Sequence, residues 1–338
     1  MTRVIKAALL CLCLATLGGG DARGQQEVTV GYQLIYNPWK VAIVNGDFEA
    51  ATGWKIDWRK FDSGAQVINA IAAGEVQIAL AGSSPVAAAV SRGIDVELFW
   101  IAEDIASAEA LVVRDGSGIV APRDLVGKTL AVPFASTTHF HTLFALERFG
   151  IDPKALTIRD MQPPEIAKAW EKGEIDATFI WDPVLGEVKR SGTVLITSGE
   201  LSALGKATFD GLVADRGFAA ANPRFMCDFV TTLAAANEAY RRDPAAWTPG
   251  SPEVKAIVEL AGGNPDDVPE VLALYGFPTL EEQASTRWLG GGSEGGAARA
   301  LLFTSEFLRD EKKIPSLLRD YGSAVNPRWV EMALAGGC

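Results

Sequence analysis

Histidine is nearly absent from this sequence, which limits the chemistry that it supports. The 338 residues contain only two, His139 and His141. Side chains two positions apart on a helix point in different directions, so this pair cannot chelate one metal ion. No pair of cysteines at metal-ligand spacing accompanies them. We therefore expect no metal site and no bound cofactor.

Cysteine is also scarce, and long apolar runs are absent. Beyond the first 24 residues only Cys227 and Cys338 remain, which excludes a disulfide scaffold but leaves one bridge open. At the start, basic Arg3 and Lys6 precede an uncharged run over 7–17, too short for the ~20 residues of a membrane span. This pattern predicts a cleavable signal peptide over residues 1–24 and an exported protein.

Positive charge is in deficit as well. The chain has 31 Lys and Arg against 42 Asp and Glu, a net charge of −11. Such an acidic chain is unsuited to nucleic acid or to an anionic membrane as its main partner. A small anion is still compatible, because helix N-termini offer N–H donors without any basic side chain. The length favours about two domains.

Short β-branched or apolar runs alternate with helix-length segments through most of the chain. The predicted strands are 28–32, 56–59, 76–80, 96–102, 110–113, 130–132, 156–160, 177–180, 195–197 and 207–214. After Asn222-Pro223 the pattern is helical to the end. The alternation predicts two α/β domains with mostly parallel sheets, and a helical tail that returns to pack on the first.

Several strand-to-helix turns carry a polar capping residue, often followed by proline. They are Asn37-Pro38, Asp62-Ser63-Gly64, Ser83-Ser84-Pro85, Ser136-Thr137-Thr138 and Asp182-Pro183. In a parallel sheet these turns share the carboxyl edge, where ligands bind. Hydroxyl groups and helix N-termini on two facing edges would bind an anion. Each turn is equally explained as an ordinary helix cap.

Four further side chains are candidates for the same cleft. Asp210 and Glu109 stand near strands that can connect the domains, where a buried carboxylate needs a partner such as a ligand ammonium, an Arg or a backbone N–H. Trp181 ends a strand and either walls a pocket or packs in the core. His139 is either a donor or base, or a structural residue. The sequence contains no Gly-x-Ser-x-Gly, phosphate-loop or His-Glu-x-x-His motif, which favours a binding protein over an enzyme.

Several stretches together resemble a known family. They are WRKFDSGAQVINAIAAGEVQIALAGSSPVA (58–87), SAEALVV (107–113), LVGKTLAVPFASTTHFHTLFAL (125–146), MQPPEIAKAWEKGEIDATFIW (161–181) and FLRDEKKIPSLLRDY (307–321). The chain resembles the periplasmic substrate-binding proteins of ABC transporters, in their nitrate/sulfonate/taurine group. The motifs FDSG, GSSP and VPF-x-STTH are similar to the taurine branch.

The resemblance implies a type II periplasmic-binding-protein fold, an α/β fold of two lobes with a helical C-terminal tail. Two crossover strands would join the lobes near Leu111–Arg114 and Leu212–Arg216. Residues 25–112 and 216–338 would form lobe I, and residues 113–215 would form lobe II. The protein would be a periplasmic monomer without enzymatic activity, which delivers its ligand to an inner-membrane permease with ATPase subunits.

The resemblance also implies a ligand and its contacts. Taurine pairs a sulfonate with an ammonium. The sulfonate would contact Ser83, Ser84, Thr137 and Thr138, and the ammonium would contact Asp210 or Glu109. Gln33, His139 and Trp181 would surround the ligand. Asp182 departs from the family pattern: it is either a helix cap or a second candidate for the ammonium. Another aliphatic sulfonate or small anion, an exported enzyme using His139, and a ligand-sensing domain are the alternatives.

Overall fold

The computed structural model describes residues 25–338, so the predicted signal peptide lies outside the described residues. Ten strands form two five-stranded sheets, close to the ranges that the sequence predicts. In spatial order the first sheet contains β2 (Lys55–Phe61), β1 (Glu27–Gln33), β3 (Ile78–Gly82), β10 (Phe209–Asp215) and β4 (Val96–Asp104). The second contains β7 (Thr157–Asp160), β6 (Thr129–Val132), β8 (Ala177–Trp181), β5 (Glu109–Arg114) and β9 (Gly192–Thr197).

Each sheet is mixed. The chain enters one strand of each sheet directly from the other sheet, and that strand runs antiparallel to its neighbours. β1 pairs in parallel with β2 and β3, whereas β10 is antiparallel to β3 and β4. In the second sheet β6 is parallel to β7 and β8, whereas β5 is antiparallel to β8 and β9. A reversed strand has its N-terminal end beside the carboxyl ends of its neighbours. Residues at the starts of β5 and β10 therefore reach the edge at which the predicted turns lie.

The chain passes between the sheets in short loops rather than in strands. It leaves the first sheet over residues 105–108, between β4 and β5, and returns over residues 204–208, just before β10. The expected crossovers therefore lie several residues too late: Leu111–Arg114 is inside β5, and Leu212–Arg216 spans the end of β10. We call the first sheet with its helices lobe I, and the second sheet with α5–α8 lobe II.

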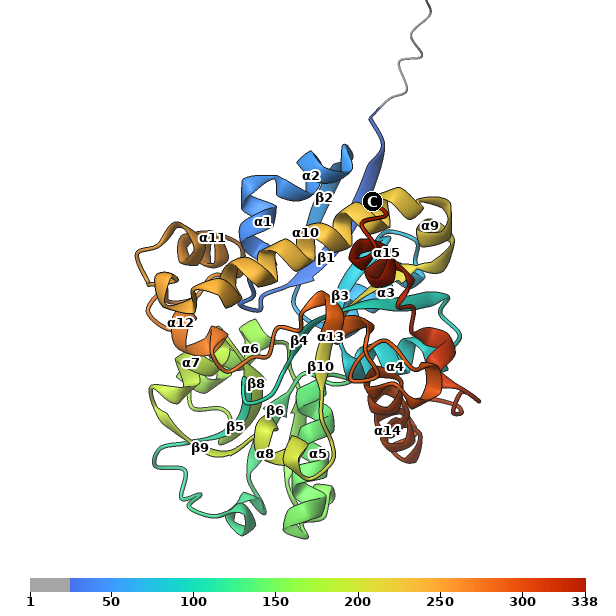
Figure 1. The fold of residues 1–338 in the computed structure, drawn as a ribbon. Helices are drawn as coiled ribbons and strands as arrows, with labels where there is room; N and C mark the ends of the chain where they lie inside the picture. The colour runs from blue at the N-terminus through green and yellow to red at the C-terminus, as the bar shows by residue number, and fades with distance from the viewer. Residues whose placement is uncertain (1–24) are drawn as a thin grey trace, which may run out of the picture.

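Helices cover both sheets (Figure 1). In lobe I, α1 (Trp39–Asn45), α2 (Asp47–Thr52), α3 (Gly64–Ala72) and α4 (Ser83–Ser91) connect the early strands. In lobe II the helices are α5 (Thr137–Phe149), α6 (Pro163–Glu171), α7 (Val184–Lys189) and α8 (Ser198–Ala203). The predicted apolar face of α3 is buried, including Val67, Ile68 and Ile71. No helix within residues 25–338 is long and apolar enough to cross a membrane.

The segment after β10 is helical and returns to lobe I, as the sequence predicts. Its helices are α9 (Arg216–Ala221), α10 (Pro223–Arg242), α11 (Pro252–Ala261), α12 (Val268–Leu272), α13 (Leu280–Ala284), α14 (Gly296–Asp310) and α15 (Arg328–Leu334). Trp329 of α15 donates to the buried Glu97 of β4 over 2.7 Å. A bridge between Leu98 and Val325 extends the first sheet at that edge.

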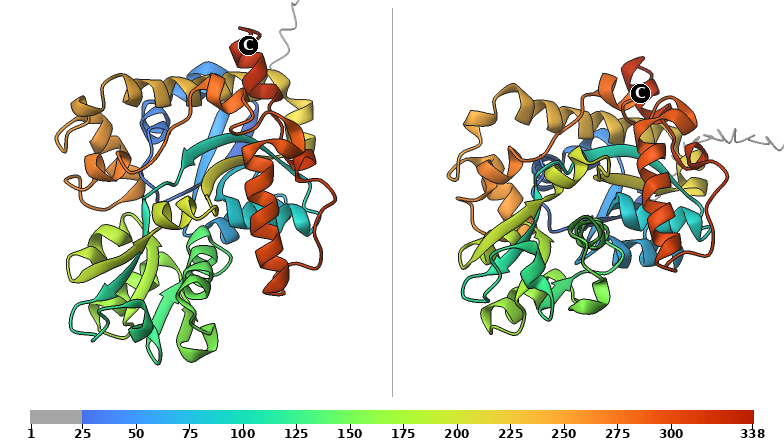
Figure 2. Two further views of the ribbon diagram at one scale, coloured as in Figure 1. Left: turned by 60° about the horizontal axis from the view of Figure 1, so that its bottom comes forward. Right: turned by 90° about the horizontal axis from the view of Figure 1, so that it is seen from below.

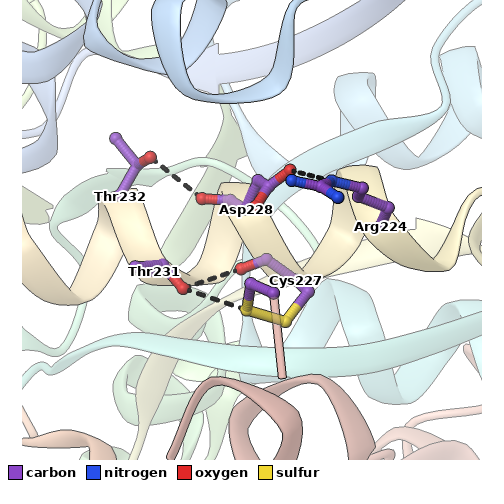
Figure 3. The surroundings of a disulfide bond; sticks show 6 residues. Arg224, Cys227, Asp228, Thr231 and Thr232 are labelled. Carbon is purple, nitrogen blue, oxygen red and sulfur yellow. Dashed lines mark hydrogen bonds and ion pairs between the residues drawn. A yellow bond between two sulfur atoms is a disulfide. The ribbon is translucent and has the colours of Figure 1, made fainter. Parts of the chain in front are cut away.

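A disulfide fixes the end of the chain to α10 (Figure 3). Cys227 and Cys338 are bonded, with their Cα atoms 5.4 Å apart and 111 residues separating them in sequence. The Thr231 hydroxyl donates to the Cys227 carbonyl over 3.0 Å and lies 3.3 Å from the Cys338 sulfur. The bridge that the sequence leaves open is therefore present, and it closes the tail from Cys227 in α10 to Cys338 into one loop.

The tail also contacts lobe II on two sides of the molecule (Figure 2). Arg190, just after α7, pairs with Asp267 over 3.1 Å. Near the other flank, the Phe307 ring of α14 packs edge-on against Phe140 of α5, with 4.9 Å between centroids. The two lobes are therefore in contact around the space between the sheets.

Candidate functional site

A small cavity lies where the facing edges of the two sheets meet. Its walls come from the ends of β1, β3 and β8, the starts of α3, α4 and α5, and the reversed strands β5 and β10. The lining residues are Gln33, Ile35, Gly64, Gly82, Pro85, Glu109, Ser136, Thr137, Trp181 and Asp210. None of these lining residues, all within the described chain, is lysine or arginine. A larger alanine-rich hollow between α1 and α10 does not contain any of the predicted site residues.

Two glycines allow the walls to come this close. A Cβ atom on Gly64 would lie 2.6 Å from the Pro85 ring, so the starts of α3 and α4 meet only because position 64 has no side chain. A Cβ on Gly82 would lie 2.8 Å from Cγ2 of Thr137. Gly82 belongs to lobe I and Thr137 to lobe II. The structure is therefore a closed arrangement, with the lobes in van der Waals contact across the cavity.

Three buried serine hydroxyls surround the start of α3 and α4. They belong to Ser63, Ser83 and Ser84, and none has a hydrogen-bond partner among residues 25–338. Ser83 and Ser84 are the first two residues of α4. Ser63 occupies the N-cap position of α3, but its side chain makes no capping hydrogen bond. The first N–H groups of each helix have no partner within that helix and carry partial positive charge. These groups together suit an anion that accepts several hydrogen bonds.

On the lobe II side, the start of α5 uses its hydroxyls differently. Ser136 is a true cap: its Oγ accepts from His139 N over 3.0 Å and donates to Pro133 O over 2.6 Å. Thr138 is bonded to Ser136 over 2.8 Å and does not line the cavity. Thr137 instead faces the cavity and donates to Glu109 Oε1 over 2.6 Å. The Ser136 hydroxyl therefore acts as an ordinary helix cap, whereas the Thr137 hydroxyl lies at the cavity.

Glu109 is almost completely buried at the start of β5. Its two oxygens are hydrogen-bonded to Thr137 and, over 3.1 Å, to the Ser198 hydroxyl. Burial raises the pKa of Glu109 to about 8, and the nearby Asp210 charge adds to the shift. Ser198 is in turn 2.8 Å from His141 Nδ1, whose ring is also buried. The carboxyl group is therefore part of a chain of polar groups that leads away from the cavity into lobe II.

Asp210 is the second carboxyl group of the cavity. It lies on β10 between Gly82 of β3 and Glu103 of β4 in the sheet register. Burial raises the pKa of Asp210 to about 7, although the Lys40 ammonium lowers it. Lys40 is completely buried and donates to Asn37 over 3.3 Å. Its ammonium acts on two carboxyl groups, Asp210 and Glu103; Glu103 accepts from the same Asn37 over 3.4 Å, and burial raises its pKa.

Gln33 and Trp181 complete the cavity wall. Both end a strand, β1 and β8 respectively, and both are buried. The Gln33 amide donates to Leu80 O over 2.9 Å, which fixes the side chain against the end of β3. Trp181 supplies the apolar surface opposite. The cavity therefore has an apolar wall and two carboxyl groups, and the unpartnered hydroxyls of Ser63, Ser83 and Ser84 belong to residues next in sequence to the lining residues Gly64, Gly82 and Pro85.

Five of the predicted site residues do not line the cavity: Ser83, Ser84, Thr138, His139 and Asp182. His139 stacks on Phe134 with 4.4 Å between ring centroids, and burial lowers its pKa to about 4. Asp182 accepts from Gly186 N over 3.0 Å, at the start of α7. Burial raises the pKa of Asp182 to about 7. This contact matches the prediction of Asp182 as a helix cap and places its carboxylate on the first turn of α7.

Comparison with known proteins places the chain in a family. Residues 37–247 match the profile of the NMT1/THI5-like family. A curated relative, the taurine-binding periplasmic protein of Escherichia coli (strain K12), is 36% identical over 305 residues, covering 90% of this chain and 93% of the relative. The chain belongs to the NMT1/THI5-like family. Its relatives in that family include periplasmic binding proteins of ABC transporters, as the sequence resemblance implies.

Solved structures agree on the fold. The alkanesulfonate-binding protein SsuA from Xanthomonas axonopodis pv. citri, bound to MOPS, superposes with a TM-score of 0.71 at 24% identity, over 86% of this chain and 94% of that one. The desulfurization enzyme DszB superposes with a TM-score of 0.65 at 15% identity, over 93% and 100%. The periplasmic-binding-protein fold is thus confirmed, and the second comparison shows that an enzyme also uses it.

Five lining residues of this NMT1/THI5-like chain were not predicted individually. They are Ile35, Gly64, Gly82, Pro85 and Ser136. Four of them stand inside motifs that the sequence singles out, FDSG, GSSP and STTH, and Ile35 alone has no such signal. Ser198 and His141, which lie behind Glu109, were also missed as site residues. Their link to Glu109 depends on the packing of α5 against α8, and no local pattern encodes that packing.

Proposed function

We propose that this protein is the periplasmic substrate-binding component of an ABC transporter, and that it captures taurine between its lobes. The observation that carries the proposal is the make-up of the cavity. The lining contains the carboxyl groups of Glu109 and Asp210 and, among its described residues, no basic side chain, and the unpartnered hydroxyls of Ser63, Ser83 and Ser84 belong to residues next to lining residues in sequence. Taurine has the matching pair of groups, an ammonium two carbons from a sulfonate.

The sulfonate would bind at the start of α3 and α4. A sulfonate is a permanent anion whose oxygens only accept hydrogen bonds. The unpartnered hydroxyls of Ser63, Ser83 and Ser84 are donors that need an acceptor once they are buried. The first N–H groups of α4 would add to them. No proton has to move for such an anion to bind.

The ammonium would bind at Asp210, with Gln33 and Trp181 beside the carbon chain. Asp210 has its charge buried and in need of a partner, and the ligand cation would supply one. Truncating one partner of a buried charge pair costs about 2–5 kcal/mol. Loss of the Asp210 charge is therefore expected to weaken taurine at least ~30-fold.

Closure of the lobes would couple binding to transport. Ser83 and Ser84 belong to lobe I and Thr137 to lobe II, so only a closed arrangement contacts the ligand from both sides. A ligand that contacts both lobes stabilises the closed state by the free energy of the added contacts. The closed, loaded protein would then dock on an inner-membrane permease with ATPase subunits.

The test is calorimetric titration of protein freed of ligand by unfolding and refolding. Taurine, ethanesulfonate and nitrate are titrated into wild type and into Asp210→Asn. We expect one-to-one taurine binding that is much tighter than ethanesulfonate binding, and a selective loss of taurine in the variant. Stronger binding of ethanesulfonate would point to another aliphatic sulfonate as ligand. No binding of either compound by refolded protein would overturn the proposal.

The same site argues for a binding protein rather than an enzyme. His139, the base that an enzymatic reading would use, stacks on Phe134 outside the cavity lining. Burial lowers its pKa to about 4, which makes the ring a weak base at neutral pH. Recovery of unchanged taurine from the bound complex, after incubation and release, checks this assignment. Appearance of sulfite or of a modified amine would contradict it.

A further inference from the structure

A continuous hydrogen-bonded chain leads from Glu109 into lobe II. Glu109 Oε2 and Ser198 Oγ are 3.1 Å apart, and Ser198 Oγ and His141 Nδ1 are 2.8 Å apart. On the far side of the ring, His141 Nε2 is 2.8 Å from the carbonyl oxygen of Lys206. Ser198 and His141 are completely buried, and Glu109 is nearly so. The proposed function does not use this chain.

The hydrogens of this chain can be counted. A carbonyl oxygen only accepts, so His141 Nε2 must carry the hydrogen that is shared with Lys206. In a neutral ring Nδ1 then accepts, and the Ser198 hydroxyl has to donate to it. A serine hydroxyl has one hydrogen, so Ser198 has none left for Glu109. The contact with Glu109 is satisfied only if Glu109 carries a proton and donates it to Ser198.

A second arrangement has the same number of protons. His141 would be an imidazolium that donates to Ser198, and Ser198 would donate to an ionised Glu109. That arrangement separates two charges in a buried region, where each ion costs several kcal/mol of lost solvation. Burial raises the pKa of Glu109 to about 8, against the hydrogen bonds of Thr137 and Ser198 that lower it, and burial lowers the pKa of His141 to about 4, which favours the arrangement with the proton on Glu109. Asp210, the one charged neighbour that acts on Glu109, acts in the same direction.

We propose that Ser198 and His141 are positioning residues that hold Glu109 as a neutral carboxylic acid, so that Asp210 provides the net negative charge of the cavity. Thr137 donates to the other Glu109 oxygen, which leaves the acid fully hydrogen-bonded. Lys40 and Glu103, which both contact the Asn37 side chain, add one cation and one carboxyl group to the surroundings of Asp210, so the region has one more carboxyl group than cation. A site with one net negative charge fits a ligand with one ammonium. This consequence for the ligand rests on the proposed function, whereas the protonation state does not.

The protonation state can be measured without any ligand. The carboxyl ¹³C resonance of Glu109, assigned by its loss in Glu109→Gln, is followed against pH in the ligand-free protein, with exposed Glu238 as the internal reference. We expect Glu109 to be protonated at pH 6.5, and the ¹⁵N shifts of His141 to report a neutral ring with its hydrogen on Nε2. An ionised Glu109 or a protonated His141 ring at pH 6.5 would overturn the inference.

A pair of histidine variants tests the positioning role. His141→Phe removes the acceptor, so the Ser198 hydroxyl becomes free to donate to an ionised Glu109, and the midpoint of the Glu109 titration falls. His139→Phe is the matched control, since His139 is equally buried but lies outside the chain. An equal midpoint in both variants would refute the role. If His141→Phe does not fold, the wild-type titration above still decides the proton's place.

Binding experiments separate this inference from the proposed function. Glutamine presents the donor and acceptor pattern of a neutral glutamic acid, so Glu109→Gln is expected to lower taurine affinity by less than tenfold. Glu109→Ala, which leaves Thr137 and Ser198 without their partner, is expected to lower it further. A loss in Glu109→Gln as large as in Asp210→Asn would refute a neutral Glu109. Failure of wild type to bind taurine would refute the ligand, with the resonance measurements unaffected.

Discussion

Taurine affinity should depend on pH through Asp210, and the structure gives the expected size of the effect. Burial raises the pKa of Asp210 to about 7 in the ligand-free site. The ionised fraction is then about one half at pH 7, about a tenth at pH 6 and about a hundredth at pH 5. The ligand's own sulfonate and ammonium keep their charges over this range.

The sign follows from which form of Asp210 binds the ligand. An ammonium favours the ionised carboxylate, so binding releases a proton and affinity rises with pH. When only the ionised fraction is competent, the apparent Kd is the intrinsic Kd divided by that fraction. The apparent Kd for taurine should therefore increase about fivefold from pH 7 to pH 6, and about fiftyfold from pH 7 to pH 5.

Calorimetry in two buffers of different ionisation enthalpy measures both the affinity and the released proton. Ethanesulfonate is the matched control ligand, because it has the sulfonate without the ammonium. Its affinity should stay flat or improve as pH falls, since a protonated Asp210 no longer repels the anion. A flat taurine profile between pH 5 and pH 7 would show that Asp210 is already ionised in the empty cavity, and would refute the reasoning.

Three further predictions concern the framework of the site. Cys338→Ser opens a loop of 111 residues and should lower the free energy of unfolding by about 4.8 kcal/mol, as measured by urea titration, with taurine affinity unaffected. Gly82→Ala places a Cβ 2.8 Å from Thr137 Cγ2 of the other lobe and 3.2 Å from Asp210 Oδ1, so taurine affinity measured by calorimetry should fall at least ~tenfold. Lys40→Met leaves Glu103 without its cation and should cost about 3–5 kcal/mol of stability at pH 8, and less at pH 6 because Glu103 then takes up a proton.

Much of the fold could be predicted because its signals are local. Strand positions follow from short apolar runs, and helix starts from Asn, Ser or Asp followed by proline. The crossovers were placed too late because the strands that follow them, β5 and β10, are apolar throughout and nothing local distinguishes a connecting strand from a sheet strand. The topology shows that each belongs wholly to one sheet. Only long-range pairing carries that information.

Some residues of the candidate site could be predicted from local sequence, and others depend on tertiary packing. Glu109, Thr137, Trp181 and Asp210 were predicted and line the cavity together, because each stands at a strand end or helix start that the pattern identifies. His139 and Thr138, which follow Thr137 at the same turn, were also predicted but do not line the cavity. One residue further along the helix turns a side chain by about 100°, so these neighbouring positions cannot all face the ligand. Which one does is decided by how α5 packs, and that packing is tertiary.

The absence of basic side chains from the cavity lining is itself a means of selection. An arginine beside the sulfonate would place a second cation within a few ångströms of the ligand's ammonium, and the two would compete for Asp210. Hydroxyl groups and helix N-termini bind the anion with partial charges only, so they leave the Asp210 charge to the ligand. A neutral Glu109 serves the same end, because a second ionised carboxylate would repel the sulfonate and favour doubly cationic ligands. Under the proposed function, the cavity would therefore select a zwitterion through one full negative charge at Asp210 set against neutral hydrogen-bond donors.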